Sequence, residues 1–539
     1  MRFIDNRLGR RPFLASAATA AGVAALRPAP ARAAAKYTRY NVTSAEGQKM
    51  LGIYRAGVEA MLNKPPEHPH NWFRNAFVHL MDCPHGNWWF FNWHRGYIGL
   101  LEQTIRTVTK EPNFTLPFWD WTELPRIPGG MFDGVLDPTN ATYLPFTKDL
   151  DTFTRFIKKP MNAYWDTLTP AQRKQQADRG NKTFEDVWTG MLSPSSPGDQ
   201  AFAATDRARY LTRQNPALSP DVAADCTPEV VLGGLGATYF YAPDSTKKYQ
   251  PVLSFNSIRT PNHNTAPGST TWFSTLEGLP HNNIHNFIGG VGGPWTAPYG
   301  NMTNNLSPVD PVFFLHHGNM DRLWDVWSRK QRAYGMSDRP LPADERNFMT
   351  EAFRFFVGPD GKYITDAKAA DYFSTDVFGY DYAKGTGEEL IPKAGLLMAA
   401  RAKPTQPTMA DGVVRGNTAT VTLRQVPAQA QLVVSVTVPR PAQGSTGDGR
   451  SFDVLLNLPP GVERVAANSP NYLAKVAFFG KHGAGHMHGK DEATFLVPLS
   501  RAKALANAVG GVAKLTISVV ASQGSGPAPA LTAVSVTAF

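Results

Sequence analysis

The sequence predicts a mainly α-helical domain, organised as a four-helix bundle with long irregular loops, followed by an all-β C-terminal sandwich domain. Three observations predict this arrangement. In the first part of the chain, apolar residues recur at helical spacing in several segments. Beyond residue 410, short runs of alternating apolar and polar residues are separated by glycine and proline. The length of 539 residues exceeds what a single core usually holds, so two or three domains are expected.

The first 33 residues have the features of an export signal. Arg10 and Arg11 precede an alanine-rich apolar run that ends in the small-residue stretch ARA at 31–33. This arrangement is typical of the twin-arginine route, with cleavage after Ala33, and predicts a periplasmic or secreted protein. The apolar run is too short and too weakly hydrophobic to remain as a membrane anchor, and we expect no other membrane span.

Four segments of the predicted helical domain, residues 36–382, carry helical signals. They span 44–64, 89–108, 281–290 and 310–335. The long stretch between the second and the fourth is rich in Pro, Gly, Asn and Ser, with few regular signals. Because histidines cluster on or beside these segments, we expect the helices to form a bundle with a metal site in its core.

The texture of the sequence changes after residue 382. Residues 383–410 resemble a linker. Residues 411–539 contain about seven short strand-like runs, such as QLVVSVTV and SFDVLLNL, between glycine- and proline-containing turns. This pattern predicts a β-sandwich.

Charge argues against a nucleic-acid-binding protein. The excess of 54 Lys+Arg over 44 Asp+Glu gives a net charge of +10, part of which lies in the export signal. No basic stripe occurs elsewhere, so we interpret the excess as an ordinary solvated surface and expect no nucleic-acid partner.

Seven of the thirteen histidines fall into two clusters. One lies within residues 79–94 and the other within residues 281–317, and each adjoins a predicted buried helix. The members are His79, His85 and His94 in the first cluster, and His281, His285, His316 and His317 in the second.

Spacing indicates which histidines of the second cluster can share an ion. His281 and His285 are four residues apart and lie on one helical face. His316 and His317 are adjacent and point about 100° apart, so at most one is expected to join them. We favour His317, because Asp321 follows it on the same face and could orient its imidazole.

The first cluster cannot lie on a single helix. His85 and His94 are nine residues apart, which places them on opposite faces of an unbroken helix. They converge only if His85 lies on the loop before the helix and His94 within it, with His79 reaching in from the preceding segment. The result is two sites of three histidines each.

Three neutral imidazoles without a carboxylate or thiolate suit copper or zinc. Either site alone could hold zinc, and a set of core histidines that bind no metal is the simpler alternative. Two such sites on facing helices favour a pair of copper ions that binds dioxygen between them.

The motifs around these histidines resemble those of the type-3 copper family of tyrosinases, catechol oxidases and molluscan haemocyanins. The resemblance covers residues 39–382, from RYN at 39–41 to YDY at 380–382, which looks like the domain-closing tyrosine motif of the family. The motifs that carry it are NWWFFNWHRGYIGLLE (87–102), LEGLPHNNIHNFIGG (276–290) and SPVDPVFFLHHGNMDRLWDVW (307–327).

The resemblance implies that each cluster binds one copper ion. The implied ligands are His79, His85 and His94 for one ion and His281, His285 and His317 for the other, with His316 as a non-ligating neighbour. It implies oxidation of small phenols by dioxygen, with o-hydroxylation of monophenols and oxidation of o-diphenols to o-quinones. A catechol oxidase, an o-aminophenol oxidase and a haemocyanin-like oxygen carrier remain alternatives.

The resemblance also implies a covalent bond between Cys83 and His85. In several members of the family a cysteine is joined through sulfur to the second histidine of the first site, and Cys83-Pro84-His85 resembles that arrangement. The alternatives are a buried free thiol and a disulfide with Cys226, the other cysteine.

The segment before His281 bears on monophenol hydroxylation. In the family, a pair like Glu277 and Asn282 looks like a holder for a water that takes the phenol proton, which favours a tyrosinase. The alternative is that Glu277 caps the start of its helix. Residues expected to shape substrate access are Asn286, Asn304, Asn305 and Leu306.

The resemblance also implies a role for the C-terminal domain. In exported or latent members of the family a β-domain covers the copper cleft until it is removed, and SFDVLLNL (451–458) resembles a motif of the plant polyphenol oxidases. The predicted linker is the natural cutting place. The stretch HGAGHMHG, which contains His482, His486 and His488, is either a copper-loading loop or a hairpin tip.

Overall fold

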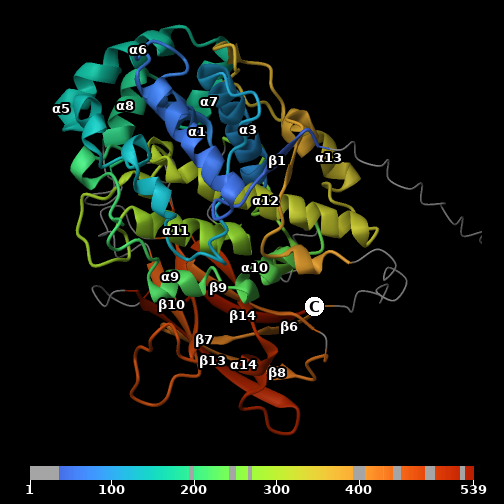
Figure 1. Cartoon of the computed structure of the whole chain (residues 1–539). Helices are drawn as coiled ribbons and strands as arrows, with labels where there is room; N and C mark the ends of the chain where they lie inside the picture. Colours follow the sequence, from blue (N-terminus) through green and yellow to red (C-terminus); the bar gives the residue numbers. More distant parts are fainter. Residues whose placement is uncertain are drawn as a thin grey trace, which may run out of the picture. The chain divides into compact units, whose positions relative to one another are not determined.

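The computed structural model describes residues 35–192, 200–241, 250–264, 270–392, 407–428, 430–440, 451–479, 492–522 and 529–539. The predicted export signal, half of the predicted linker, and His482, His486 and His488 lie outside these ranges. Residues Lys36–Phe539 form one compact unit. Within it we distinguish a helical part (residues 36–392) and a β part (residues 407–539), shown in Figure 1.

The helices that carry the histidine motifs form where the sequence predicts them. Of the four predicted helices, three carry histidines of the clusters. They are α3 (Phe90–Thr109), α11 (Asn282–Ile288) and α12 (Val312–Ala333). A π-helical turn, Glu277–His281, leads into α11. The segment predicted over 44–64 becomes α1 (Ala45–Leu62), which begins at the N-cap Ser44, whose side chain accepts from the backbone N–H of Gly47.

One helix of the core was not predicted. Helix α2 (Trp72–Asp82) begins at Asn71, whose side chain accepts from the backbone N–H groups of Phe73 and Arg74. It ends before Cys83, because Pro84 disfavours a helical conformation in the residue that precedes it. Helix α2, and not α1, contributes a histidine to the centre of the molecule.

The stretch between α3 and α11 has more regular structure than its composition suggests. Several helices begin with a Ser-Pro or Thr-Pro pair, which is a helix-start signal that the prediction overlooked. The helices are α4 (Leu144–Thr147), α5 (Leu150–Phe153), α6 (Lys159–Asp166), α7 (Pro170–Asp178), α8 (Phe184–Leu192), α9 (Pro220–Ala224) and α10 (Pro228–Leu235), and α13 (Pro342–Met349) follows α12.

Two short sheets close the helical part. Strand β1 (Tyr37–Arg39) pairs in parallel with β5 (Tyr380–Tyr382), which brings together the two ends of the stretch that resembles the type-3 copper family. Strands β3 (Phe356–Val357) and β4 (Tyr363–Ile364) form an antiparallel pair.

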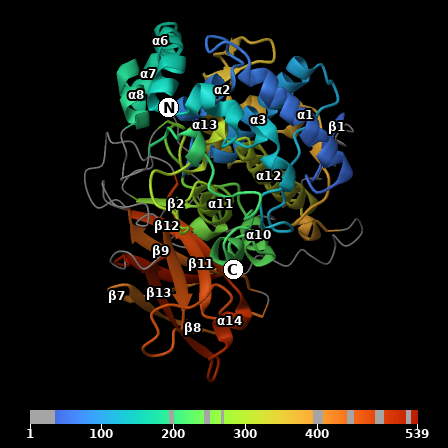
Figure 2. The same ribbon diagram turned by 60° about the vertical axis from the view of Figure 1, so that its left-hand side comes forward.

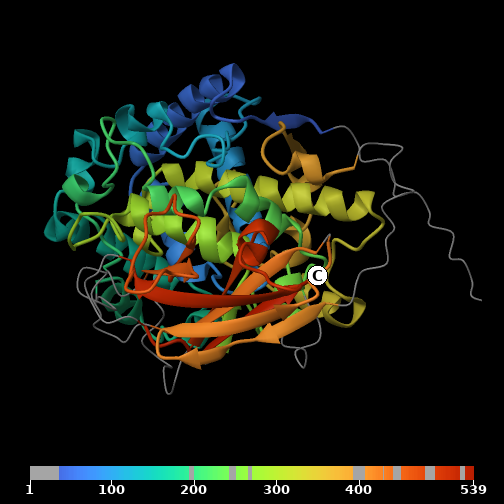
Figure 3. The ribbon, with the colours of Figure 1, turned by 90° about the horizontal axis from the view of Figure 1, so that it is seen from below.

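The β part is a sandwich of two five-stranded sheets, as the alternating pattern predicts. Their strand orders are β11-β10-β13-β8-β7 and β2-β12-β9-β14-β6. In Figure 3 these strands, orange to red, lie against green and yellow helices. The strands are β6 (Thr408–Asp411), β7 (Val413–Arg415), β8 (Thr418–Arg424), β9 (Leu432–Pro439), β10 (Ser451–Leu456), β11 (Tyr472–Ala477), β12 (Glu492–Leu499), β13 (Val512–Ala521) and β14 (Ala533–Ala538), with the short helix α14 (Arg501–Leu505) after β12.

The helical part contributes one strand to this sandwich. Strand β2 (Thr270–Phe273), four residues before the π-helical turn, pairs in parallel with β12 (Figure 2). Next to it, the fully buried ring of Phe495 stacks on Phe273 at 5.2 Å between centroids and meets Phe478 edge-on at 5.3 Å. The sheet therefore joins the two parts of the chain.

Phe495→Ala is expected to lower the free energy of unfolding by about 3–5 kcal/mol, because it leaves a cavity between two aromatic rings in this shared sheet. Val413→Ala is a suitable control, since Val413 is 66% exposed and its loss is expected to cost less than about 0.5 kcal/mol. Chemical denaturation measures both. Equal effects would contradict a packed junction.

Candidate metal centre

The first histidine cluster joins two helices and the loop between them. His79 lies on α2, His85 on the loop and His94 on α3. One ring nitrogen from each lies within 4.8 Å of the others, and the Nε2 atoms of His79 and His94 are 3.4 Å apart. This is the convergence that the spacing predicts.

The second cluster is formed by α11, the turn before it and α12. His281 ends the π-helical turn, His285 lies on α11, and His316 and His317 are adjacent on α12. Ring nitrogens of all four lie within 4.8 Å of one another, and the Nε2 atoms of His285 and His317 are 3.2 Å apart.

The two clusters adjoin each other. The rings of His94 and His317 stack with centroids 4.2 Å apart, and those of His85 and His281 lie 5.8 Å apart. Two ions held by these clusters would be neighbours, with one donor set on each side.

Hydrogen bonds to Nδ1 orient the rings of four of these histidines. In each of them Nδ1 faces an oxygen of the chain, which leaves Nε2 as the donor atom for an ion. The contacts are His79 to the carbonyl of Asn305 (2.8 Å), His94 to that of Phe90 (2.7 Å), His285 to that of Met302 (2.8 Å) and His281 to Oδ1 of Asn282 (2.9 Å).

The imidazoles are in the form that binds metals. Burial lowers the pKa of His79 and of His281 to about 3, so both rings are neutral at ordinary pH. Within the described ranges, the buried Nε2 atoms of His85 and His281 have no hydrogen-bond partner. Such buried polar atoms are costly unless something binds them, and a metal ion would.

The donor set fits copper. Both clusters consist of imidazoles alone, with no carboxylate or thiolate among the grouped side chains. Imidazole donors suit copper and zinc rather than magnesium or calcium. Two adjoining imidazole clusters therefore fit a pair of such ions.

His316 is the unexplained member of the second cluster. It is fully buried, and among the described residues neither of its ring nitrogens has a hydrogen-bond partner. Nε2 of His317 lies 3.2 Å from that of His285, and the ring of His316 is also part of the cluster, with its centroid 5.0 Å from that of His285 and 5.4 Å from that of His281. That His317 rather than His316 is the ligand stays a prediction.

Cys83 and His85 meet as the sequence suggests. Cys83 caps the C-terminus of α2, and its Sγ lies 3.5 Å from Nδ1 of His85. Burial raises the pKa of the Cys83 thiol to about 12. Cys226 is also buried and free, so the alternative of a disulfide between the two cysteines is wrong.

Glu277 reaches across to the first cluster instead of capping its own helix. Its carboxylate accepts from the backbone N–H of Gly86 at 2.5 Å and from the hydroxyl of Ser257. Burial raises the pKa of Glu277 to about 8. A buried carboxyl group therefore lies between the loop that carries His85 and the turn that carries His281.

An aromatic ring from the β part lies against both clusters. Phe479 follows β11, and its ring centroid is 4.9 Å from that of His85, 5.4 Å from that of His281 and 4.4 Å from that of His285. Phe479 is only 3% exposed. Sequence reasoning missed it, since nothing in the segment YLAKVAFFG distinguishes this phenylalanine from others.

Asparagines of α11 hold the strand that carries this ring. Each donates a side-chain N–H to a backbone carbonyl in or just after β11, so the contact does not depend on the strand's side chains. The pairs are Asn282 with Ala477 (2.8 Å), Asn283 with Lys475 (2.7 Å) and Asn286 with Phe478 (2.8 Å).

Comparison with known proteins identifies the family. A family model described as the common central domain of tyrosinase matches residues 54–330, just over half of the chain. The chain belongs to the tyrosinase family. The match spans the helical part from α1 to α12, including every histidine of both clusters.

Curated relatives are distant. A chloroplastic polyphenol oxidase of Vitis vinifera is 24% identical over 413 residues, which cover 73% of this chain and 55% of the relative. The tyrosinase HcTyr2 of Hahella sp. is 24% identical over 309 residues, which cover 51% of this chain and 50% of the relative. The chain thus spans about half the length of these tyrosinase-family relatives.

Solved structures show the same fold. The structure titled latent aurone synthase (polyphenol oxidase) from natural source has a TM-score of 0.52 at 18% identity, and the match covers 93% of this chain and 89% of that one. The match extends over both the helical part and the β part, which fits a tyrosinase-family fold with a C-terminal β region.

The sequence-based role of Asp321 needs correction. Its carboxylate does not accept from a histidine. One oxygen accepts from Arg95 Nε at 2.6 Å, and the other from the hydroxyl groups of Tyr380 and Tyr382 and from Arg39 Nη1 at 3.3 Å. Hydrogen bonds from charged and hydroxyl groups are stronger than one from the neutral imidazole of His317, four residues away. Asp321 therefore connects the RYN and YDY motifs to α12.

The stretch expected to shape access contacts a histidine of the first cluster. The carbonyl of Asn305 faces the ring of His79, the Asn304 amide donates to the carbonyl of Gln200 at 2.8 Å, and Leu306 is buried. A role of these residues, and of Asn286, in substrate entry stays a prediction. The side-chain amide of Asn286 donates to the carbonyl of Phe478, the residue before Phe479.

Within the described part of the chain, no helix has the length and apolar character needed to cross a membrane.

His317→Gln is expected to weaken binding of one of two copper ions by more than about 100-fold, because it removes the ring nitrogen that faces His285. His316→Gln is the matched variant one residue away and should weaken binding by no more than about 10–100-fold, as outer-shell changes do. Metal content after dialysis against a competing chelator measures both. The reverse order would make His316 the ligand.

Proposed function

We propose that this chain is a copper-dependent oxidase of small phenols, which hydroxylates monophenols at the ortho position and oxidises o-diphenols to o-quinones with dioxygen. The observation that carries the proposal is the pair of adjoining clusters of neutral, buried imidazoles. The residues that would hold one copper ion are His79, His85 and His94, and those that would hold the other are His281, His285 and His317.

A copper pair, when bound, supplies the electron exchange with dioxygen that this chemistry needs. The chain supplies a dry and rigid setting. The ring of Phe90 lies 4.7 Å from those of His94 and His281, and that of Phe313 lies 4.1 Å from that of His317. This aromatic shell limits ring movement and excludes water.

Glu277 and Asn282 are proposed to hold the water that accepts the phenol proton. Glu277 is a buried carboxyl group next to the His85 loop, and Asn282 directly follows His281. In the intact chain the Asn282 amide is occupied by the carbonyl of Ala477. The N–H group bound to Ala477 therefore becomes available to a water when β11 leaves α11.

The intact chain is proposed to be latent. The ring of Phe479 lies against three of the histidines, where the ring of a phenol must come to react. The asparagines of α11 keep it there through backbone carbonyls. Cutting the predicted linker at 383–410 after export by the twin-arginine route, followed by loss of the β part, would open the centre.

A thioether between Cys83 and His85 is part of the proposal. The Sγ atom and the His85 ring are already in contact. Forming the bond replaces the S–H bond and one ring C–H bond by a C–S bond, and releases two protons and two electrons that dioxygen accepts. A peptide spanning both residues would then be lighter by two hydrogen atoms.

Oxygen uptake by the copper-loaded protein tests the function directly. Uptake with a phenol and with its matching catechol, rising after light proteolysis, is the expected result. In the cut protein, Glu277→Gln is expected to slow uptake with the phenol by about 10²–10⁴-fold and to spare the catechol, because only the phenol must lose a proton to a base.

Other outcomes of this experiment lead to other functions. Uptake with the catechol alone would indicate a catechol oxidase, and preference for an o-aminophenol over the catechol an o-aminophenol oxidase. Bound copper without uptake would contradict an enzyme and favour an oxygen carrier.

Phe479→Ala is expected to raise oxygen uptake with a catechol by the uncut chain on the order of tenfold, because the ring that blocks the centre is gone. Leu515→Ala is the control, since Leu515 is a buried residue of β13 that belongs to the sandwich core. Equal activation by both would indicate general loosening of the β part. No activation by Phe479→Ala would rule out blocking by this ring.

A further inference from the structure

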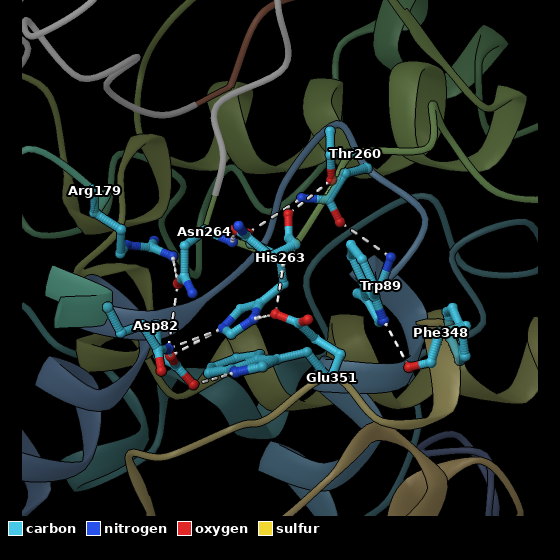
Figure 4. Close-up of polar contacts among 12 residues, drawn as sticks. Asp82, Trp89, Arg179, Thr260, His263, Asn264, Phe348 and Glu351 are labelled. Atoms are coloured by element: carbon cyan, nitrogen blue, oxygen red, sulfur yellow. Dashed lines mark hydrogen bonds and ion pairs between the residues drawn. The ribbon is translucent and has the colours of Figure 1, made fainter. Parts of the chain in front are cut away.

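A second buried polar cluster is drawn in Figure 4. It shares no residue with the first histidine cluster and adjoins it through Trp93, which contacts both Asp82 and His94. At its centre is His263, whose side chain is fully buried. Its Nε2 lies 3.0 Å from Oδ1 of Asp82, and its Nδ1 lies 2.5 Å from Oε1 of Glu351. The ring thus joins the end of α2 to the segment after α13.

Geometry makes this ring an imidazolium. Each ring nitrogen faces a carboxylate oxygen, and Nε2 also lies 3.1 Å from Nε2 of Gln175. Because an ionised carboxylate only accepts hydrogen bonds, the two carboxylates favour a proton on both ring nitrogens. Burial alone lowers the pKa of His263, but the attraction of Asp82 and Glu351 outweighs it and raises the pKa above its ordinary value. This histidine is therefore the opposite of the neutral ones in the metal centre.

Asp82 is held from three sides. Its Oδ2 accepts from Nε1 of Trp93 at 2.7 Å, and its Oδ1 accepts from His263 and from the side-chain amide of Gln175. Trp93 precedes the predicted ligand His94 on α3. The carboxylate is thus a junction between α2, α3 and α7.

The residues on either side of Asp82 are held as well. Nε2 of Gln176, on α7, donates to the carbonyl of Met81 at 2.8 Å. Nη2 of Arg179 donates to the carbonyl of Cys83 at 2.8 Å, and its Nη1 to the side chain of Asn264 at 3.2 Å. Three consecutive residues that lead into the His85 loop are therefore fixed from outside the metal centre.

We propose that His263 is a positioning residue, which clamps the end of α2 and thereby fixes the Cys83–His85 loop that presents His85 to the first cluster. The proposal rests on the proposed function only in taking His85 as a ligand. The clamp itself is a property of the metal-free chain.

The two cysteines allow a direct test on the protein produced without added copper. Cys83 lies in the clamped loop, whereas Cys226 is equally buried and lies far along the chain, after α9. His263→Asn is expected to speed alkylation of Cys83 about tenfold and to leave Cys226 unchanged, because only the loop opens locally. Peptide mass spectrometry gives both rates.

The charge of the clamp gives the test a pH signature. Since the folded-state pKa of His263 is raised, the stabilisation is complete below the ordinary histidine pKa of about 6.5 and is lost as pH rises through the folded-state value. The charged groups that act on the ring are Asp82 from α2 and Glu351 after α13, while Arg179 holds the same loop. The Cys83 rate of the variant divided by that of the parent should therefore fall towards one at alkaline pH.

Two further variants keep the test decisive. Glu351→Gln removes one carboxylate without removing the histidine, and should speed Cys83 alkylation by less than His263→Asn. His70→Asn is the matched control, because His70 is also buried but bonds the carbonyl of Gly358 at 2.8 Å; it should leave the Cys83 rate unchanged.

Some results would overturn the clamp. These are a parental Cys83 rate in both His263→Asn and Glu351→Gln, or a ratio of rates that stays constant with pH. If the His263→Asn protein unfolds, Cys226 will be alkylated as well. The Cys83 rate of Glu351→Gln then provides the test of the clamp. Oxygen uptake by the copper-loaded parent tests the proposed function separately, so either idea can fail alone.

Discussion

The structure depends on keeping a group of buried histidines neutral while fixing their rings. Backbone carbonyls and one amide oxygen orient four of the rings at Nδ1, and none of these partners carries a charge. A carboxylate in the same place would raise the pKa of the histidine, so that protons would compete with a metal ion for the ring. His263, between Asp82 and Glu351, shows what two carboxylates do to the same side chain.

One acid near the second cluster is paired with arginines. Asp321, one turn beyond His317, is bound by Arg39 and Arg95, and the guanidinium of Arg39 lies 3.6 Å from the ring centre of Tyr380. Because β1 and β5 pair beside this network, the two ends of the helical part meet at the helix that carries His317. The same contacts that close the helical part also pair the carboxylate of Asp321 with two arginines.

Local signals predicted much of this structure, and long-range contacts account for what they did not predict. Helical spacing placed His281 and His285 on one face, and alternation predicted the sandwich. By contrast, Phe479 is one of 31 phenylalanines, and only tertiary structure brings it to the histidines. Asp321 has the right spacing to orient His317, but its carboxylate accepts hydrogen bonds from Arg95 and Tyr382 instead, which lie in distant segments of the chain. Strand β2 is only four residues long and gains its partner 222 residues later, at β12.

The pairing of β2 with β12 connects the β part to the helical part, and cutting the linker does not break these backbone hydrogen bonds. Four residues register along the two strands, and the π-helical turn with Glu277 and His281 begins only a few residues after β2. A severed C-terminal fragment would therefore have to break this pairing before it leaves, and its departure would pull on the backbone next to the second cluster. It would also bare the edge of β12, a row of unpaired backbone groups that invites association with other strands. The released fragment is accordingly expected to self-associate or be degraded, which would make activation irreversible.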